Sequence, residues 1–169
     1  MAAGAVAAAG PAVVAAVVGF LVVAAAVAAV VREGVGNMHP RAFSKHLDHD
    51  GIVAAIHDAE LKTTGQIRVR ISPKHLDDPV AAAQAEFLRL GLQQFPERNA
   101  VLIFVAPRAH KFAVVGDTAV HAQCGDAFWR ELAAAMAGYF RRSEFTPGII
   151  HGVQKAGELL AQHFPRPKV

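Results

Sequence analysis

Four residues at the ends of two strand-like segments are the strongest candidates for a binding site. Arg98 and Asn99 precede the apolar run 100–106, and Gly116 and Asp117 follow the segment 111–115. If these segments pair as an antiparallel hairpin, the four residues meet at one end of the sheet, where their guanidinium, amide and carboxylate groups would line a site. The alternative is that they only form turns at the strand ends, as Asn, Gly and Asp often do.

Two short motifs match phosphatase spacings but lack the surroundings that the chemistry needs. Asp48-His49-Asp50 resembles the paired aspartates of haloacid-dehalogenase-like phosphatases, which lie at the end of a buried strand. Here a helix is expected to follow, and helix capping is the better account. Cys124 and Arg130 have Cys-x5-Arg spacing, but the residues between them are typical of an amphipathic helix and not of a phosphate-binding loop. We therefore expect Cys124 to be a structural thiol.

Histidine and carboxylate pairs suggest incomplete metal or acid–base sites. His46 with His49, and His121 with Cys124, are three residues apart and would share a helix face, but two ligands do not complete a metal site. Glu60 and Asp117 would be a separated carboxylate pair, although each is as well suited to pairing with backbone groups. The chain has no Gly-x-Ser-x-Gly elbow, P-loop or Gly-x-Gly-x-x-Gly motif. We assign no catalytic residue.

The elements that would position these residues predict one α/β domain over residues 46–165, followed by a tail at 166–169. They are expected, in the order α-β-α-β-β-α-α, at residues 51–63, 67–71, 79–94, 100–106, 111–115, 119–142 and 147–163. Apolar residues alternate with arginines over 67–71, which indicates a half-buried strand. The unbroken apolar run 100–106 indicates a central strand covered on both faces. The predicted architecture is α/β/α, with helices flanking a small mixed β-sheet.

An Ala/Val-rich segment, residues 1–37, precedes the domain and is uncharged up to its first charged residue, Arg32. Residues 12–31 are uniformly apolar, and a helix of about 20 residues matches the ~30 Å hydrocarbon core of a bilayer. We expect one N-terminal hydrophobic helix that spans a membrane. Basic residues follow it and none precedes it, so the domain is expected in the cytoplasm. Two alternatives remain open: a signal peptide without the usual basic start, and translation from Met38, which gives a cytoplasmic protein.

Composition excludes some classes of protein. The net charge is +3, and the Lys and Arg residues are scattered instead of clustered beside aromatic rings, so we expect no nucleic-acid partner. The single cysteine excludes an internal disulfide framework and a Cys-rich zinc site.

An ordered series of short motifs runs through the domain. The series comprises Ile52 to Glu60, Thr63-Thr64-Gly65-Gln66-Ile67-Arg68-Val69, Phe87, Leu90-Gly91, Arg98-Asn99-Ala100-Val101-Leu102-Ile103, Gly116-Asp117, Phe128-Trp129 and Phe145-Thr146-Pro147-Gly148-Ile149. In this order it resembles the TPM domain, named for thylakoid, photosystem-repair and acetylcholine-receptor-modulating members. The resemblance extends over about residues 47–165. It departs from the family at Gln66, where a glutamate is usual.

The resemblance implies an α/β/α fold, frequent attachment to a transmembrane helix, and a role in membrane-protein maintenance or partner binding. Some plant members are credited with acid phosphatase activity and calcium binding. Among the acidic residues here only Asp117 matches a family motif, so the resemblance implies that calcium, if bound, is held by Asp117. We expect a membrane-tethered, non-catalytic domain that binds a protein partner. The alternatives are a weak phosphomonoesterase, with Asp117 and Asn99 near its site, and a soluble domain that begins at Met38.

Overall fold

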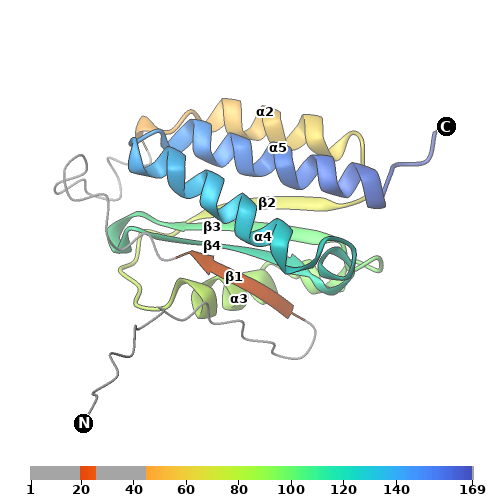
Figure 1. The fold of residues 1–169 in the computed structure, drawn as a ribbon, viewed down its shortest axis with the longest axis horizontal. Coiled ribbons are helices and arrows are strands. Elements are labelled where there is room, and N and C mark those ends of the chain that lie inside the picture. The colour runs from red at the N-terminus through yellow and green to blue at the C-terminus, as the bar shows by residue number, and fades with distance from the viewer. Residues whose placement is uncertain (1–19, 26–44, 169) are drawn as a thin grey trace, which may run out of the picture.

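The chain folds into a mixed sheet with helices on both faces, as seen in a computed structural model (Figure 1). The structure describes the backbone of residues 20–25 and the whole of residues 45–168. The elements are β1 (Phe20–Ala25), α2 (His49–Glu60), β2 (Gln66–Ile71), α3 (Pro79–Arg89), η1 (Leu92–Gln94), β3 (Ala100–Ala106), η2 (Pro107–Ala109), β4 (Lys111–Asp117), α4 (Thr118–Arg141) and α5 (Phe145–His163). From α2 onward the helices and strands follow the predicted order α-β-α-β-β-α-α.

The strands lie in the order β1-β4-β3-β2. Strands β2 and β3 run parallel, with Gln66 opposite Ala100, and α3 supplies the crossover that a parallel pair needs. Strands β3 and β4 form an antiparallel hairpin, with Val101 opposite Gly116. Both the small mixed sheet and the hairpin predicted from the sequence are confirmed.

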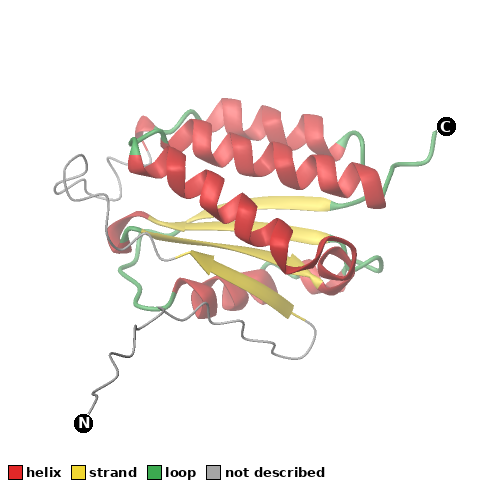
Figure 2. Ribbon diagram, in the orientation of Figure 1, coloured by secondary structure: helices red, strands yellow, loops and turns green. Residues whose placement is uncertain are grey.

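Helices cover the two faces of the sheet, with α2, α4 and α5 on one face and α3 on the other (Figure 2). Alternate residues of β3 point into the two cores. Val101 and Ile103 pack beneath α4 and α5, whereas Leu102 and Phe104 pack against α3. This alternation explains why the run 100–106 has no polar position, and it confirms that β3 is covered on both faces.

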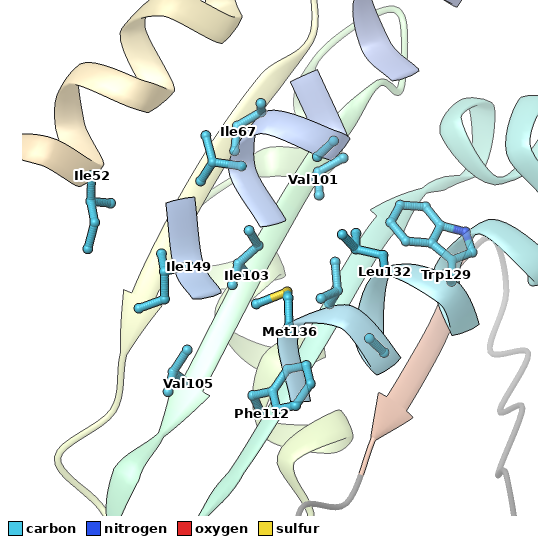
Figure 3. Packing of buried hydrophobic residues seen from close by; sticks show 14 of the residues in the cluster. Ile52, Ile67, Val101, Ile103, Val105, Phe112, Trp129, Leu132, Met136 and Ile149 are labelled. Atoms are coloured by element: carbon cyan, nitrogen blue, oxygen red, sulfur yellow. The ribbon is translucent and has the colours of Figure 1, made fainter. Parts of the chain in front are cut away.

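The larger core lies under α2, α4 and α5 and is filled by branched and aromatic side chains (Figure 3). Ile67, Ile103, Met136 and Trp129 are almost completely buried, and each such side chain contributes about 1.5–3 kcal/mol by leaving water. Burial of these side chains therefore stabilises the packing of the helices on the sheet.

The helix predicted over residues 79–94 ends earlier than expected. Helix α3 stops at Arg89, and a short 3-10 turn, η1, follows. The cause is Gly91, whose φ of 69° is left-handed, a conformation that glycine adopts without steric cost and that commonly ends a helix.

The helix predicted over residues 12–31 is not observed at residues 20–25, which form strand β1 at the edge of the sheet. The remaining residues of that segment lie outside the described residues. Runs of Phe, Leu and Val suit a buried strand as well as an apolar helix, so hydrophobicity alone does not separate the two. None of the helices that the structure describes is both long and apolar enough to cross a membrane.

Gly116 tests how tightly α4 packs on β4. A Cβ atom at this position would lie 2.3 Å from Cζ2 of Trp129, whereas a Cβ at Gly138 would meet only Arg142, at 3.8 Å. We expect Gly116→Ala to lower the free energy of unfolding by about 1–3 kcal/mol through overpacking. Gly138→Ala, in the same helix as Trp129, should leave stability unchanged or raise it by up to about 1 kcal/mol. Urea denaturation measures both, and equal effects would contradict the close contact.

Candidate functional site

Three strand ends meet at one end of the sheet and gather the predicted polar residues. The amino ends of β2 and β3 lie beside the carboxyl end of β4, because β2 is parallel and β4 antiparallel to β3. Arg98 and Asn99 stand before β3, and Gly116 and Asp117 end β4. The structure therefore brings the four residues together as the hairpin predicted, while their role in binding stays a prediction.

A bidentate ion pair joins Arg98 to Asp117. Nε of Arg98 donates to Oδ2 of Asp117 at 2.8 Å, and Nη2 donates to Oδ1, also at 2.8 Å. Asp117 is fully buried, whereas the Arg98 side chain is 39% exposed. The hydrogen bonds to Asp117 raise the pKa of the Arg98 guanidinium above its ordinary value. Arg98 thus keeps its charge against a carboxylate that has no access to water.

Asp117 is also the N-cap residue of α4. Its Oδ1 accepts a hydrogen bond of 2.7 Å from the backbone N–H of Thr118. Burying a carboxylate costs several kcal/mol, but hydrogen bonds to charged groups contribute roughly 1.5–3 kcal/mol each, and the positive end of the helix dipole adds to them. With two guanidinium bonds and one amide bond, these gains offset the cost of burial.

The backbone of Arg98 reinforces the same junction. Its φ of 50° is left-handed, which is uncommon for a residue with a side chain, and the carbonyl of Arg98 accepts a hydrogen bond from Ala119 N at 3.2 Å. Arg98 therefore holds the start of α4 twice, through its side chain on Asp117 and through its own carbonyl.

A second polar group ties β2 to β3 at the same end. Nδ2 of Asn99 donates to Oε2 of Glu97 at 2.8 Å and to Oγ1 of Thr64 at 3.1 Å, and the Thr64 hydroxyl donates to Glu97. Asn99 is buried and Glu97 exposed. Thr64 and Glu97 are not among the site residues predicted from the sequence. The signal for Thr64 is the parallel pairing of β2 with β3, which places their amino ends side by side.

Calcium does not fit Asp117 as the residues are arranged. A calcium ion takes six to eight oxygen ligands, usually with several carboxylates. Both oxygens of Asp117 face the Arg98 guanidinium, a cation that would repel another. Among residues 20–25 and 45–168, no group of three or more His, Cys, Asp or Glu side chains could hold a metal ion.

The other carboxylates singled out from the sequence stabilise local structure. Glu60 accepts from Ile67 N and from Arg68, each at 2.8 Å, at the junction of α2 with β2, and so serves a different junction from Asp117. Asp48 caps α2 by accepting from Gly51 N at 2.9 Å, which confirms helix capping as the account of the Asp48-His49-Asp50 motif.

Cys124 lies in the first part of α4, where Gly125 interrupts the helical dihedrals with a φ of 66°. The thiol is half-buried, and burial raises its pKa from 9.0 to about 11. A thiol with a raised pKa is a poor nucleophile near neutral pH, because the thiolate is the reactive form. This agrees with a structural thiol and not with a phosphatase cysteine.

The chain is similar to a known domain family and to a solved structure. The TPM domain matches residues 43–159 of the chain. The chain belongs to the TPM domain family. A solved relative, the BA42 protein from the psychrophilic bacterium Bizionia argentinensis, determined by NMR, is 33% identical and superposes with a TM-score of 0.66. The match covers 73% of this chain and 87% of that protein. No curated protein matches the chain.

Within the residues that match the TPM domain, Thr64, Arg98-Asn99 and Gly116-Asp117 lie at the polar end of the sheet. Gln66 accepts a hydrogen bond from Nη2 of Arg68 at 3.0 Å. It therefore belongs to the α2–β2 junction with Glu60.

The strength of the Arg98–Asp117 pair can be measured by a double-mutant cycle with Arg98→Met and Asp117→Asn. We expect a coupling energy of about 1–2 kcal/mol, below the range for fully buried pairs because Arg98 is partly exposed. The control is Arg142→Met with Glu144→Gln, a pair at 3.0 Å that is exposed on both sides and should couple by less than about 1 kcal/mol. Urea denaturation of the variants gives both values. Equal coupling in the two cycles would show that burial of Asp117 adds nothing.

Proposed function

We propose that this chain is a non-catalytic TPM domain that binds a protein partner. The observation that carries the proposal is the closed polar cluster at the sheet end. Both carboxylate oxygens of Asp117 are engaged by Arg98 and by the first amide of α4. A general base or a nucleophile must reach the substrate, and a buried carboxylate that already accepts three hydrogen bonds does not offer that access. The cluster is better suited to fixing α4 on the sheet.

The rival function is weak phosphomonoesterase activity. It requires an activated nucleophile and cationic groups free to hold phosphate. In the described cluster, the guanidinium of Arg98 already holds a carboxylate in the bidentate manner in which it would hold phosphate. Cys124, with a pKa of about 11, is not activated. These two facts favour binding over catalysis.

The proposal includes attachment to a membrane through residues 12–31, with the domain on the cytoplasmic side. Its support is the length of the uncharged segment and the basic residues that follow it. Residues 20–25 cannot pair with β4 and lie in a bilayer helix at the same time. The anchored form would therefore leave the β4 edge of the sheet without β1.

Turnover of p-nitrophenyl phosphate decides between binding and catalysis. We expect the purified full chain to release no p-nitrophenol above the buffer blank, with or without Ca²⁺ or Mg²⁺. The variants to compare are Asp117→Asn and Glu86→Gln, since Glu86 pairs with Arg70 and Arg89, away from the cluster. Activity that Asp117→Asn abolishes and Glu86→Gln retains, at a temperature where both are folded by circular dichroism, would overturn the proposal. Activity that both retain would point to a contaminating phosphatase.

Carbonate extraction of native membranes tests the attachment. We expect the untagged protein to stay in the washed membrane, and mass spectrometry to detect peptides from residues 1–37. Insertion of an apolar helix survives high pH, whereas charge-dependent adsorption does not. A protein found only in the soluble fraction, with its sequence beginning at Met38, would contradict the attachment.

A further inference from the structure

Strand β4 has the composition of a central strand, yet it is an edge strand of the three strands, β4, β3 and β2, that lie within the TPM match. Residues 112–116 carry no charge and are buried, with Phe112 and Val114 in the core under α4 and Ala113 and Val115 in the core against α3. The TPM match begins at residue 43, so β1 lies outside it. Without β1, the outer edge of β4 would present unpaired backbone groups along an apolar strand.

The opposite edge of the sheet is built differently. Strand β2 carries Arg68 and Arg70, which are about half-exposed and pair with Glu60 and Glu86 at 2.8 and 3.0 Å. Charged side chains on an edge strand discourage the pairing of another strand. Strand β4 has no charged residue between Lys111 and Asp117, and no proline. The β2 edge is thus protected against pairing, whereas the outer edge of β4 accepts a strand, which here is β1.

We propose that the β4 edge is a strand-docking site, which residues 20–25 occupy within the same chain and which the protein partner fills with an extended segment in place of β1. This deepens the proposed function, on which it rests for the existence of a partner. The occupancy by residues 20–25 stands independently, because β1 pairs antiparallel with β4 over its whole length, from Phe20 opposite Asp117 to Ala25 opposite Phe112.

The chemistry of the occupant follows from the place it takes. Strand β1 contacts both α4 and α3, so a strand in this position lies between helices on both faces. Alternate side chains of a strand point to opposite faces, and a charged one would be buried on either side at a cost of several kcal/mol. The partner segment is therefore uncharged, apolar and free of proline over about six residues, like the sequence FLVVAA of β1.

Release of β1 does not require the domain to unfold. Residues 26–44 separate β1 from the described part of the domain, and a chain reaches up to about 3.5 Å per residue. Within the described sheet β1 is the outermost strand, and its strand partner is β4. A strand that replaces β1 would form the same ladder of hydrogen bonds with β4, so the backbone groups of β4 would again have partners.

The test uses the full chain and the variant Val22→Pro/Val23→Pro. Successive amides of a strand point to opposite sides, so one of the two prolines removes a hydrogen bond to β4. The matched control is Val13→Pro/Val14→Pro, which precedes β1. The probe is a fluorescein-labelled peptide with the sequence FLVVAA between lysine pairs, and the control peptide carries FLPPAA.

We expect the alternate amides of β4 that face β1 to exchange at least about ten-fold faster in Val22→Pro/Val23→Pro, while the amides of β3 stay protected. The FLVVAA peptide should restore their protection. Its affinity for this variant should exceed that for the wild type and for Val13→Pro/Val14→Pro by about ten-fold or more, because β1 competes within the chain. The FLPPAA peptide should do neither.

Four results would overturn the inference. The first three are unchanged exchange of β4 in Val22→Pro/Val23→Pro, equal affinity of the peptide for this variant and the wild type, and binding that leaves β4 unprotected. A stable wild-type dimer by light scattering, with β4 protected by the other copy, would replace the partner segment with a second chain and also overturn it. Failure of the proposed function is seen separately, as phosphatase turnover, and does not alter the exchange of β4.

Discussion

Strands β3 and β4 form a hairpin in which no charged side chain lies within residues 100–106 or 112–116, and much of the fold follows from this constraint. Apolar residues on both faces of a strand must be covered on both faces. Helices α2, α4 and α5 cover one face of the sheet and α3 the other. The same constraint applies along the outer edge of β4, where β1 completes the hydrogen bonds.

The polar residues lie at the end of the sheet where the apolar strands of this hairpin stop. Charge begins at Asp117, where α4 also begins, and a carboxylate in this place serves the helix start while it is shielded from water. Arg98 supplies the counter-charge from the turn before β3, and Asn99 joins the cluster to β2 through Thr64. The residues that first suggested a ligand site thus hold three secondary-structure elements together.

This division of roles affects how a TPM domain can act in this chain. The polar residues at the sheet end pair with one another, while residues 112–116 of β4 carry no charged side chain. Recognition through backbone hydrogen bonds tolerates many sequences of similar chemistry. On the proposed function, the domain would select its partner mainly by extended conformation and lack of charge.

The sequence by itself determined the element order, the central position of β3, the hairpin and the capping role of Asp48, because each depends on a local pattern of apolar, turn-forming or capping residues. It also placed Arg98, Asn99, Gly116 and Asp117 at one sheet end, since the hairpin fixes their distance. It missed the early end of α3, where Gly91 takes a left-handed φ.

Only the tertiary structure decided which groups satisfy one another. Both carboxylate oxygens of Asp117 accept hydrogen bonds from Arg98. The side chain of Asn99 donates to both Thr64 and Glu97. The carboxylate of Glu60 accepts from Arg68. Such pairings depend on how strands and helices pack and on burial, which no local pattern records. The conformation of residues 20–25 was likewise not determined by the sequence alone. A run of Phe, Leu, Val and Ala suits both a bilayer helix and a buried strand. Residues 20–25 form a strand in this structure because they pair with the backbone groups along the edge of β4.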